Sequence, residues 1–138
     1  MDRAESLDRL AAARSGHLAT IRPDDRPHVV VVTFALIDGF AVTAIDHKPK
    51  STRRLQRIAN IEANPVASLL VDYYDDDDWE SLWWVRVDGE ATIHDEGSVR
   101  EQAIEALRIK YAQYEERPPE GPVIAVALDS VSSWASSE

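Results

Sequence analysis

The chain has 138 residues, of which 44% are hydrophobic and 29% are charged, and its net charge is −10. This size and composition are typical of one globular domain over residues 1–138, and they exclude a membrane-spanning helix because no apolar run approaches about 20 residues. The absence of cysteine excludes disulfides, thiolate metal sites and cysteine nucleophiles. Since the first residues contain no apolar signal core, we expect a cytoplasmic protein.

The first half of the chain predicts one helix and then a meander of strands. In residues 5–14, Leu7, Leu10 and Ala11 recur with helical spacing, and Gly16 follows as a helix stop. Three strands are expected next, rich in β-branched or apolar residues and joined by turns: residues 17–21, 29–34 and 40–45.

The second half predicts two more helices and three more strands. Apolar spacing indicates a helix over residues 51–62 and another over residues 99–114, the latter opening with a capping box formed by Ser98 and Glu101. The further strands are residues 66–73, 82–93 and 123–128, the second of them with a bend at Gly89. Six strands in hairpin-like order predict a mainly β fold with helices (α+β), a small six-stranded antiparallel β-barrel with peripheral helices.

A short basic segment stands out in this acidic chain. Residues 47–61 contain five basic residues and no acidic one. The segment leads into the second predicted helix, and four polar residues lie at the helix entry: Lys48, Lys50, Ser51 and Thr52. Hydroxyls and free backbone N–H groups at the positive end of a helix dipole bind anions, so this pattern predicts a phosphate site. The alternative is a solvated basic helix face on which Ser51 or Thr52 only caps the helix.

Other candidate groups give weaker signals. Trp83 and Trp84 are neighbours on one predicted strand and therefore point to opposite faces, so one of them can border a groove for a flat ring. The alternative is that both are core or dimer-interface residues. The four histidines are scattered and no metal site is assigned. No nucleophile elbow, GxGxxG or P-loop is present, so no catalytic residue is assigned and a bound cofactor would carry any redox chemistry.

Sequence stretches across the chain resemble a known superfamily. Four of them resemble the pyridoxamine 5′-phosphate oxidase-like split β-barrel superfamily, which has an FMN-binding-like fold: residues 17–24, 26–30, 32–34 and 46–50. Four more are similar to its actinobacterial deazaflavin-dependent branch: residues 53–55, 60–65, 82–86 and 121–126. One departure bears on the cofactor, because Val31 stands where this branch often has proline and restores a backbone donor near the ring floor.

The resemblance implies a split β-barrel homodimer with cofactors in grooves at the dimer interface. It implies that Lys48, Lys50 and Ser51 contact the cofactor phosphate. It also implies a floor for the ring, made by four strand residues: Val32, Thr33, Ala44 and Ile45. Arg53, Arg54 and Trp84 are further cofactor-binding candidates by the same resemblance.

The leading hypothesis is therefore an oxidoreductase that uses coenzyme F-420, an 8-hydroxy-5-deazaflavin, to pass hydride to or from a small organic substrate. The alternative is an FMN-binding oxidase or reductase similar to pyridoxamine 5′-phosphate oxidase, because the same phosphate site suits FMN. A third possibility is a non-catalytic carrier or sensor of such a cofactor or of haem. Neither nucleic acid nor a membrane is expected as a partner, because five basic residues in an acidic chain release few counterions.

Overall fold

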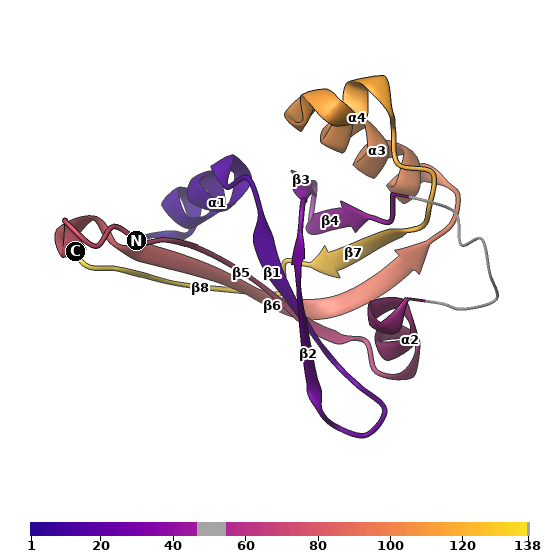
Figure 1. Ribbon diagram of the computed structural model, residues 1–138, viewed down its shortest axis with the longest axis horizontal. Helices are drawn as coiled ribbons and strands as arrows, with labels where there is room; N and C mark the ends of the chain where they lie inside the picture. The colour runs from indigo at the N-terminus through magenta and orange to yellow at the C-terminus, as the bar shows by residue number, and fades with distance from the viewer. Residues whose placement is uncertain (47–54, 138) are drawn as a thin grey trace.

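The computed structural model describes residues 1–46 and 55–137, and in this part of the chain eight strands form one antiparallel sheet (Figure 1). The strands are β1 (Gly16–Ile21), β2 (Pro27–Val32), β3 (Ala35–Ile37), β4 (Phe40–Ala44), β5 (Val66–Tyr73), β6 (Trp83–His94), β7 (Val123–Ala127) and β8 (Ser130–Ala135). The helices are α1 (Arg3–Ala12), α2 (Gln56–Ala63), α3 (Ser98–Lys110) and α4 (Ala112–Glu116), with one 3-10 turn, η1 (Trp79–Ser81). Among the helices described, none is long and apolar enough to cross a membrane.

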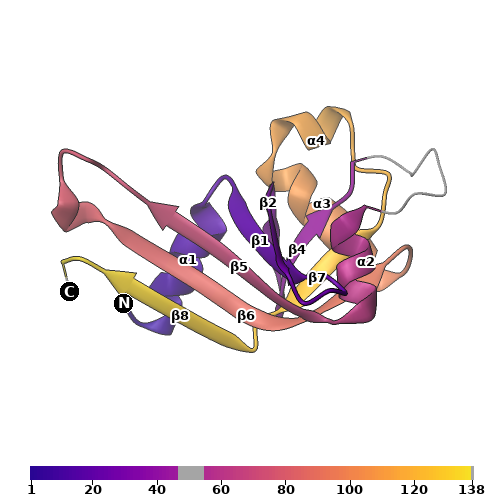
Figure 2. The same cartoon turned by 60° about the horizontal axis from the view of Figure 1, so that its bottom comes forward.

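The long strand β6 joins the two halves of the sheet. The strand order is β2-β1-β5-β6-β7-β4-β3, and β8 also pairs with β6. The first part of β6 lies between β5 and β8, whereas its last four residues pair with β7 (Figure 2). The described part of the sheet is open, because β2 and β3 form its two ends. This architecture confirms a mainly β fold with helices and is consistent with a split barrel, but the predicted number of six strands is too low.

Two features of the chain account for the additional strands. The strand predicted over residues 29–34 ends at Val32 and pairs with β1 as β2, and after Thr33 and Phe34 a short strand that was not predicted, β3, pairs with β4. The serine-rich tail after the sixth predicted strand forms β8 and pairs with β6 over residues 130–135. Periodicity misses β8 because its pairing depends on backbone hydrogen bonds to β6, with only Val131 packed against the core.

Helices occur at all three predicted places, but they begin and end at other residues than predicted. Leu55 has extended backbone, so α2 begins at Gln56, and residues 51–54 of the predicted helix lie outside the described residues. The expected capping box is wrong, because Gly97 (φ 97°) is the N-cap of α3 and Ser98 lies inside the helix. The predicted helix 99–114 is interrupted at Tyr111, where extended backbone separates α3 from α4.

The helices divide the core into two clusters. Leu10 of α1 and Ile58 of α2 pack with inward-facing strand residues such as Leu18. Ala103 and Leu107 of α3 pack on the other half of the sheet, over β3, β4 and β7. Figure 1 shows α3 and α4 together over this second half, while α1 lies near the two termini.

A half-buried lysine, Lys110, lies at the end of α3. The ammonium of Lys110 lies 4.1 Å from the centre of the Phe34 ring and 5.4 Å from that of Tyr111. Its Nζ is buried and has no hydrogen-bond partner in the described part of the chain. Burial, together with the positive charge of Arg14, lowers the pKa of Lys110 to about 8.

The bend of β6 requires glycine at position 89. A Cβ atom built on Gly89 would overlap the carbonyl oxygen of Ala127, which is backbone and cannot turn aside. We expect Gly89→Ala to lower the free energy of unfolding by about 3 kcal/mol, measured by urea denaturation, because overpacking forces the two strands apart. Glu90→Ala at the exposed neighbouring position is the control and should have little effect. Equal stability of both variants would contradict the close approach.

Lys110→Met should stabilise the protein at neutral pH. The pKa of Lys110 is lower in the folded state than in the unfolded chain, so the charged form opposes folding below about pH 8. As pH rises from about 8 to 10.5 the unfolded chain binds the extra proton, and the wild type gains stability relative to the methionine variant. Because the side chain is half-buried, we expect a difference on the order of 1 kcal/mol at pH 7.

The measurement is urea denaturation of wild type and variant at a series of pH values. Their stabilities should converge as the pH approaches 10.5. Lys110→Arg is the control, since arginine stays charged and should show no such gain. A constant difference between wild type and Lys110→Met at every pH would show that the ammonium is not destabilised by folding.

Candidate functional site

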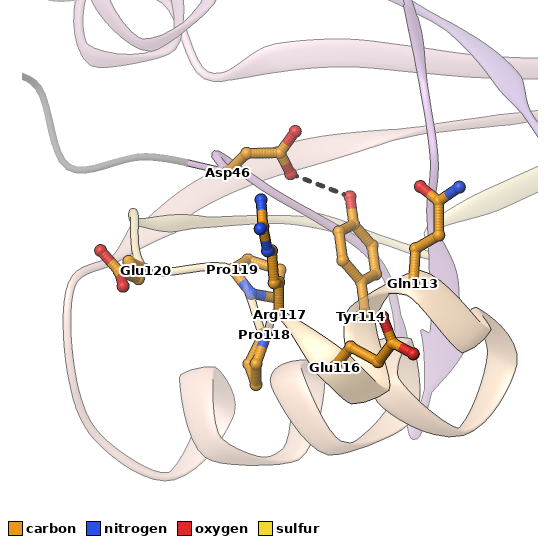
Figure 3. A pocket seen from close by; sticks show the side chains of 8 residues that line it. All are labelled: Asp46, Gln113, Tyr114, Glu116, Arg117, Pro118, Pro119 and Glu120. Atoms are coloured by element: carbon orange, nitrogen blue, oxygen red, sulfur yellow. Dashed lines mark hydrogen bonds between the residues drawn. The ribbon is translucent and has the colours of Figure 1, made fainter.

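A pocket of about 810 Å³ lies between the end of β4 and the α4–β7 connection (Figure 3). Its lining consists of Asp46 and a continuous stretch around the end of α4: Gln113, Tyr114, Glu116, Arg117, Pro118, Pro119 and Glu120. The helix ends here because proline cannot continue it and disfavours helical backbone in the preceding residue. The sequence therefore turns the chain away from α4 and opens the space beside it.

Backbone hydrogen bonds hold the two walls of this pocket together. Ile45 N donates to Pro122 O at 2.9 Å, and Gly121 N donates to Ile45 O at 2.9 Å. Glu120 N donates to Asp46 O at 3.1 Å. These bonds continue the β4–β7 ladder beyond its last pair, so the position of Asp46 relative to the opposite wall is fixed by the sheet.

Tyr114 connects this pocket to the β2–β3 crossing, the two residues Thr33 and Phe34 that join these strands. Its hydroxyl lies 2.8 Å from Thr33 Oγ1 and donates to Asp46 Oδ1 at 3.1 Å (Figure 3). Burial raises the pKa of Tyr114, and the negative charge of Asp46 adds to this effect, while the hydrogen bond with Thr33 opposes it. The phenol therefore keeps its proton and can act as a hydrogen-bond donor.

Tyr111 holds the same crossing from the other side. Its hydroxyl accepts from Phe34 N at 3.2 Å and lies 2.9 Å from the carbonyl oxygen of Arg14. The rings of Tyr111 and Tyr114 meet edge to face, with centroids 5.6 Å apart. Thr33 and Phe34 are thus fixed by two tyrosines of the α3–α4 segment, and Phe34 is 1% exposed.

The pocket itself is acidic, and a basic residue lies near it on α2. Three carboxylates line the pocket against one guanidinium: Asp46, Glu116 and Glu120 against Arg117. Arg57 is half-buried, and its Nε is buried without a hydrogen-bond partner among the described residues. Burial lowers the pKa of Arg57, and the charge of Asp46 opposes that shift. Arg57 is therefore a half-buried basic residue whose charge interacts with the Asp46 carboxylate of the pocket.

The structure places the predicted ring-floor residues at the ends of β2 and β4. Val32, Ala44 and Ile45 are 6–7% exposed and pack in the core, so any ligand there meets their backbone more than their side chains. Thr33 is half-buried and is joined to Asp46 through Tyr114. The structure therefore brings Thr33 close to the end of β4, as a shared floor requires.

The predicted phosphate residues lie outside the described residues: Lys48, Lys50, Ser51, Thr52, Arg53 and Arg54. The chain enters that segment directly after Asp46, which lines the pocket, and it returns at Leu55. Because α2 begins at Gln56, its first free N–H groups belong to Gln56 and Arg57. The phosphate contacts of Ser51 and Thr52 stay a prediction.

Trp84 is not brought to this site within one chain. It pairs with Asp72 and Trp134 near the start of β6. The end of β4 lies at the other end of β6, since Ala44 and His94 both pair with Val123. Ten residues of strand separate Trp84 from His94, which is roughly 30 Å. Trp84 can reach such a site only in a second copy of the chain.

Tyr114 and Asp46 were not predicted as site residues. The helical spacing of Tyr114 with Tyr111 and Leu107 assigned it to the core, and Asp46 was only part of the family resemblance. No group of three or more His, Asp or Glu side chains in residues 1–46 and 55–137 is placed to hold a metal ion. The described site thus consists of a hydroxyl, a phenol and a carboxylate beside an acidic pocket.

Comparison with known proteins gives the family. A profile of the family described as pyridoxamine 5′-phosphate oxidase matches residues 3–135. A search of curated proteins finds no match.

Solved structures share the fold along nearly the whole chain. A conserved hypothetical protein of Mycobacterium tuberculosis has a TM-score of 0.79 and 26% identity, covering 99% of this chain and 86% of that one. A FAD-binding protein of Mesorhizobium loti has a TM-score of 0.71 and 21% identity, covering 96% and 92%. The FAD-binding protein of Mycobacterium smegmatis has a TM-score of 0.70 and 17% identity, covering 97% and 96%. With the family profile matching all but the ends, the chain belongs to the pyridoxamine 5′-phosphate oxidase family.

Proposed function

We propose that this protein is an oxidoreductase that binds coenzyme F-420 and passes hydride to or from a small organic substrate. One observation carries the proposal: the pocket beside Asp46 adjoins the point where the chain enters the basic residues of the 47–61 segment. Family membership and the flavin-binding neighbours support a cofactor with a phosphate and a flat ring. The cofactor supplies the hydride chemistry when it is bound.

The residues of this chain would bind and orient the cofactor. Lys48 and Lys50 would pair with the phosphodiester, because charge-assisted hydrogen bonds to phosphate are the strongest contacts available to a short basic segment. The Nε of Arg57 has no hydrogen-bond partner within residues 1–46 and 55–137, and it would serve a further anionic group, which favours a cofactor with an acidic tail. Arg53 and Arg54 would serve the same tail. Ring placement over Thr33 and the end of β4 would bring the reacting carbon to a fixed position for the substrate.

FMN is the alternative cofactor. The same lysines suit its single phosphate, and the resemblance to FAD-binding proteins favours a flavin ring. The protein would then be an oxidase or reductase of the pyridoxamine 5′-phosphate oxidase type, or a carrier that binds flavin without turnover. Because FMN lacks the acidic tail, it would leave Arg57 with Asp46 as its anionic neighbour and no contact to the cofactor.

Binding of the two cofactors tests the proposal. We expect purified protein to bind oxidised coenzyme F-420 more tightly than FMN, measured by calorimetry or cofactor fluorescence at moderate salt. Lys50→Ala should weaken binding by about 1–3 kcal/mol, the size of a charge-assisted hydrogen bond, with an unchanged melting temperature. Arg26→Ala, in the exposed turn before β2, is the control. A wild type that binds neither cofactor would refute the proposal, and tighter binding of FMN would favour the alternative.

We also propose that the site is completed in a homodimer. Strand register places several apolar side chains on the face of β2, β1, β5, β6 and β8 opposite the core: Val29, Val31, Leu70, Trp84 and Trp134. Val29, Val31 and Trp134 are 60%, 68% and 44% exposed, which is a large apolar area for a surface. A second copy on this face would cover it and offer the partner its own Trp84.

A charge placed on this face should separate the subunits. We expect Val31→Asp to convert a dimer into a folded monomer in light scattering, because a carboxylate would be buried without a partner. Ile109→Asp on α3, at a residue that is 77% exposed, is the matched control and should leave the dimer intact. A monomeric wild type, or a Val31→Asp variant that stays dimeric, would show that this face is not the interface.

A further inference from the structure

We infer that Thr33 binds the cofactor ring as a hydrogen-bond acceptor only, and that Tyr114 is the positioning residue that fixes this polarity. The inference rests on the proposed function, since it concerns the ring that the proposed cofactor carries. It adds a specificity residue, because an acceptor at this place selects which edge of the ring can lie there.

The donors and acceptors in the hydrogen bonds that link Thr33, Tyr114 and Asp46 follow from the carboxylate of Asp46. The Asp46 carboxylate only accepts, so Tyr114 gives its single proton to Asp46 Oδ1 at 3.1 Å. The phenol oxygen can then only accept from Thr33, whose Oγ1 lies 2.8 Å away. The proton of the Thr33 hydroxyl is therefore committed to Tyr114, and the hydroxyl presents only lone pairs to a ligand.

The surroundings of Thr33 leave those lone pairs available. Thr33 is half-buried, and no second hydrogen bond to its hydroxyl occurs within residues 1–46 and 55–137. Its backbone is held in place by the neighbouring Phe34, whose N–H and C=O both meet the Tyr111 hydroxyl. A fixed acceptor favours a ligand N–H and disfavours a ligand carbonyl or ring nitrogen, which would leave both groups unsatisfied.

Ring chemistry identifies the matching ligand group. In the oxidised flavin ring the imide N–H at position 3 is the only ring donor, and the other heteroatoms accept. The 8-hydroxy-5-deazaflavin ring keeps the same imide and carries one further donor, its hydroxyl, at the opposite end of the ring, so the ring end that faces Thr33 is taken to be the imide end in both cofactors. Thr33 would therefore accept from this N–H in either cofactor, and the inference does not depend on which of the two the protein uses.

Methylation of the imide nitrogen tests the contact. We compare FMN with N3-methyl-FMN, and coenzyme F-420 with its N3-methyl derivative, by measuring dissociation constants. The wild type should bind the unmethylated cofactor about tenfold more tightly, the scale of one hydrogen bond with a buried acceptor left unpaired. Thr33→Val should bring this ratio close to one, and Thr33→Ser should keep it. Tyr114→Phe should reduce the ratio, because the freed hydroxyl proton can then turn toward the ligand.

Controls separate this role from a structural one. Thr92→Val on β6 should leave the ratio unchanged, and melting temperatures show whether the Thr33 and Tyr114 variants fold. If the wild type binds neither cofactor, the proposed function fails. If it binds a cofactor but shows no preference over the methylated form, or if Thr33→Val keeps the preference, the inference fails while the proposed function stands. Full preference in Tyr114→Phe would remove the positioning role of Tyr114.

Discussion

The crossing of the chain at Thr33 and Phe34 couples the fold to the site. Phe34 is buried, and the ammonium of Lys110 lies over its ring in a cation–π contact. Its backbone meets the Tyr111 hydroxyl, and the preceding Thr33 meets Tyr114. Any shift of the α3–α4 segment would therefore move the crossing, and any shift of the crossing would move the Thr33 hydroxyl that is hydrogen-bonded to Tyr114 of the pocket lining.

Sequence periodicity predicts the elements that are locally consistent. The bounds of β5 match the predicted strand, and Gly89, where the sequence predicts a bend of β6, is the point at which β6 closely approaches the backbone of Ala127. The crossing was missed because Val32, Thr33 and Phe34 continue a β-branched and apolar run with no glycine or proline to mark a break. The break between α3 and α4 was missed for a related reason, since Tyr111 and Tyr114 keep helical spacing across it.

The site shows the same division between local and long-range information. Charge alone indicated the basic segment after His47, because its signal lies in consecutive residues. The chain of Thr33, Tyr114 and Asp46 joins residues far apart in the sequence, and no local pattern pairs them. What brings Tyr114 and Asp46 together is the passage of the chain from α4 into β7, which pairs with β4, a tertiary contact that periodicity does not encode. Sequence patterns therefore do not predict long-range hydrogen bonds of this kind.

Electrostatics distinguishes the acidic pocket from the basic segment over residues 47–61, which holds five of the 15 lysine and arginine residues and no acidic one. The pocket lining has an excess of carboxylates, so a phosphate is repelled from the pocket and attracted to the residues that follow Asp46. The two environments meet at Asp46, and in the proposed function this would place the phosphate end of the cofactor after that residue. The ring would then extend from there toward Thr33, and the polarity of Thr33 would select the edge of the ring that faces it.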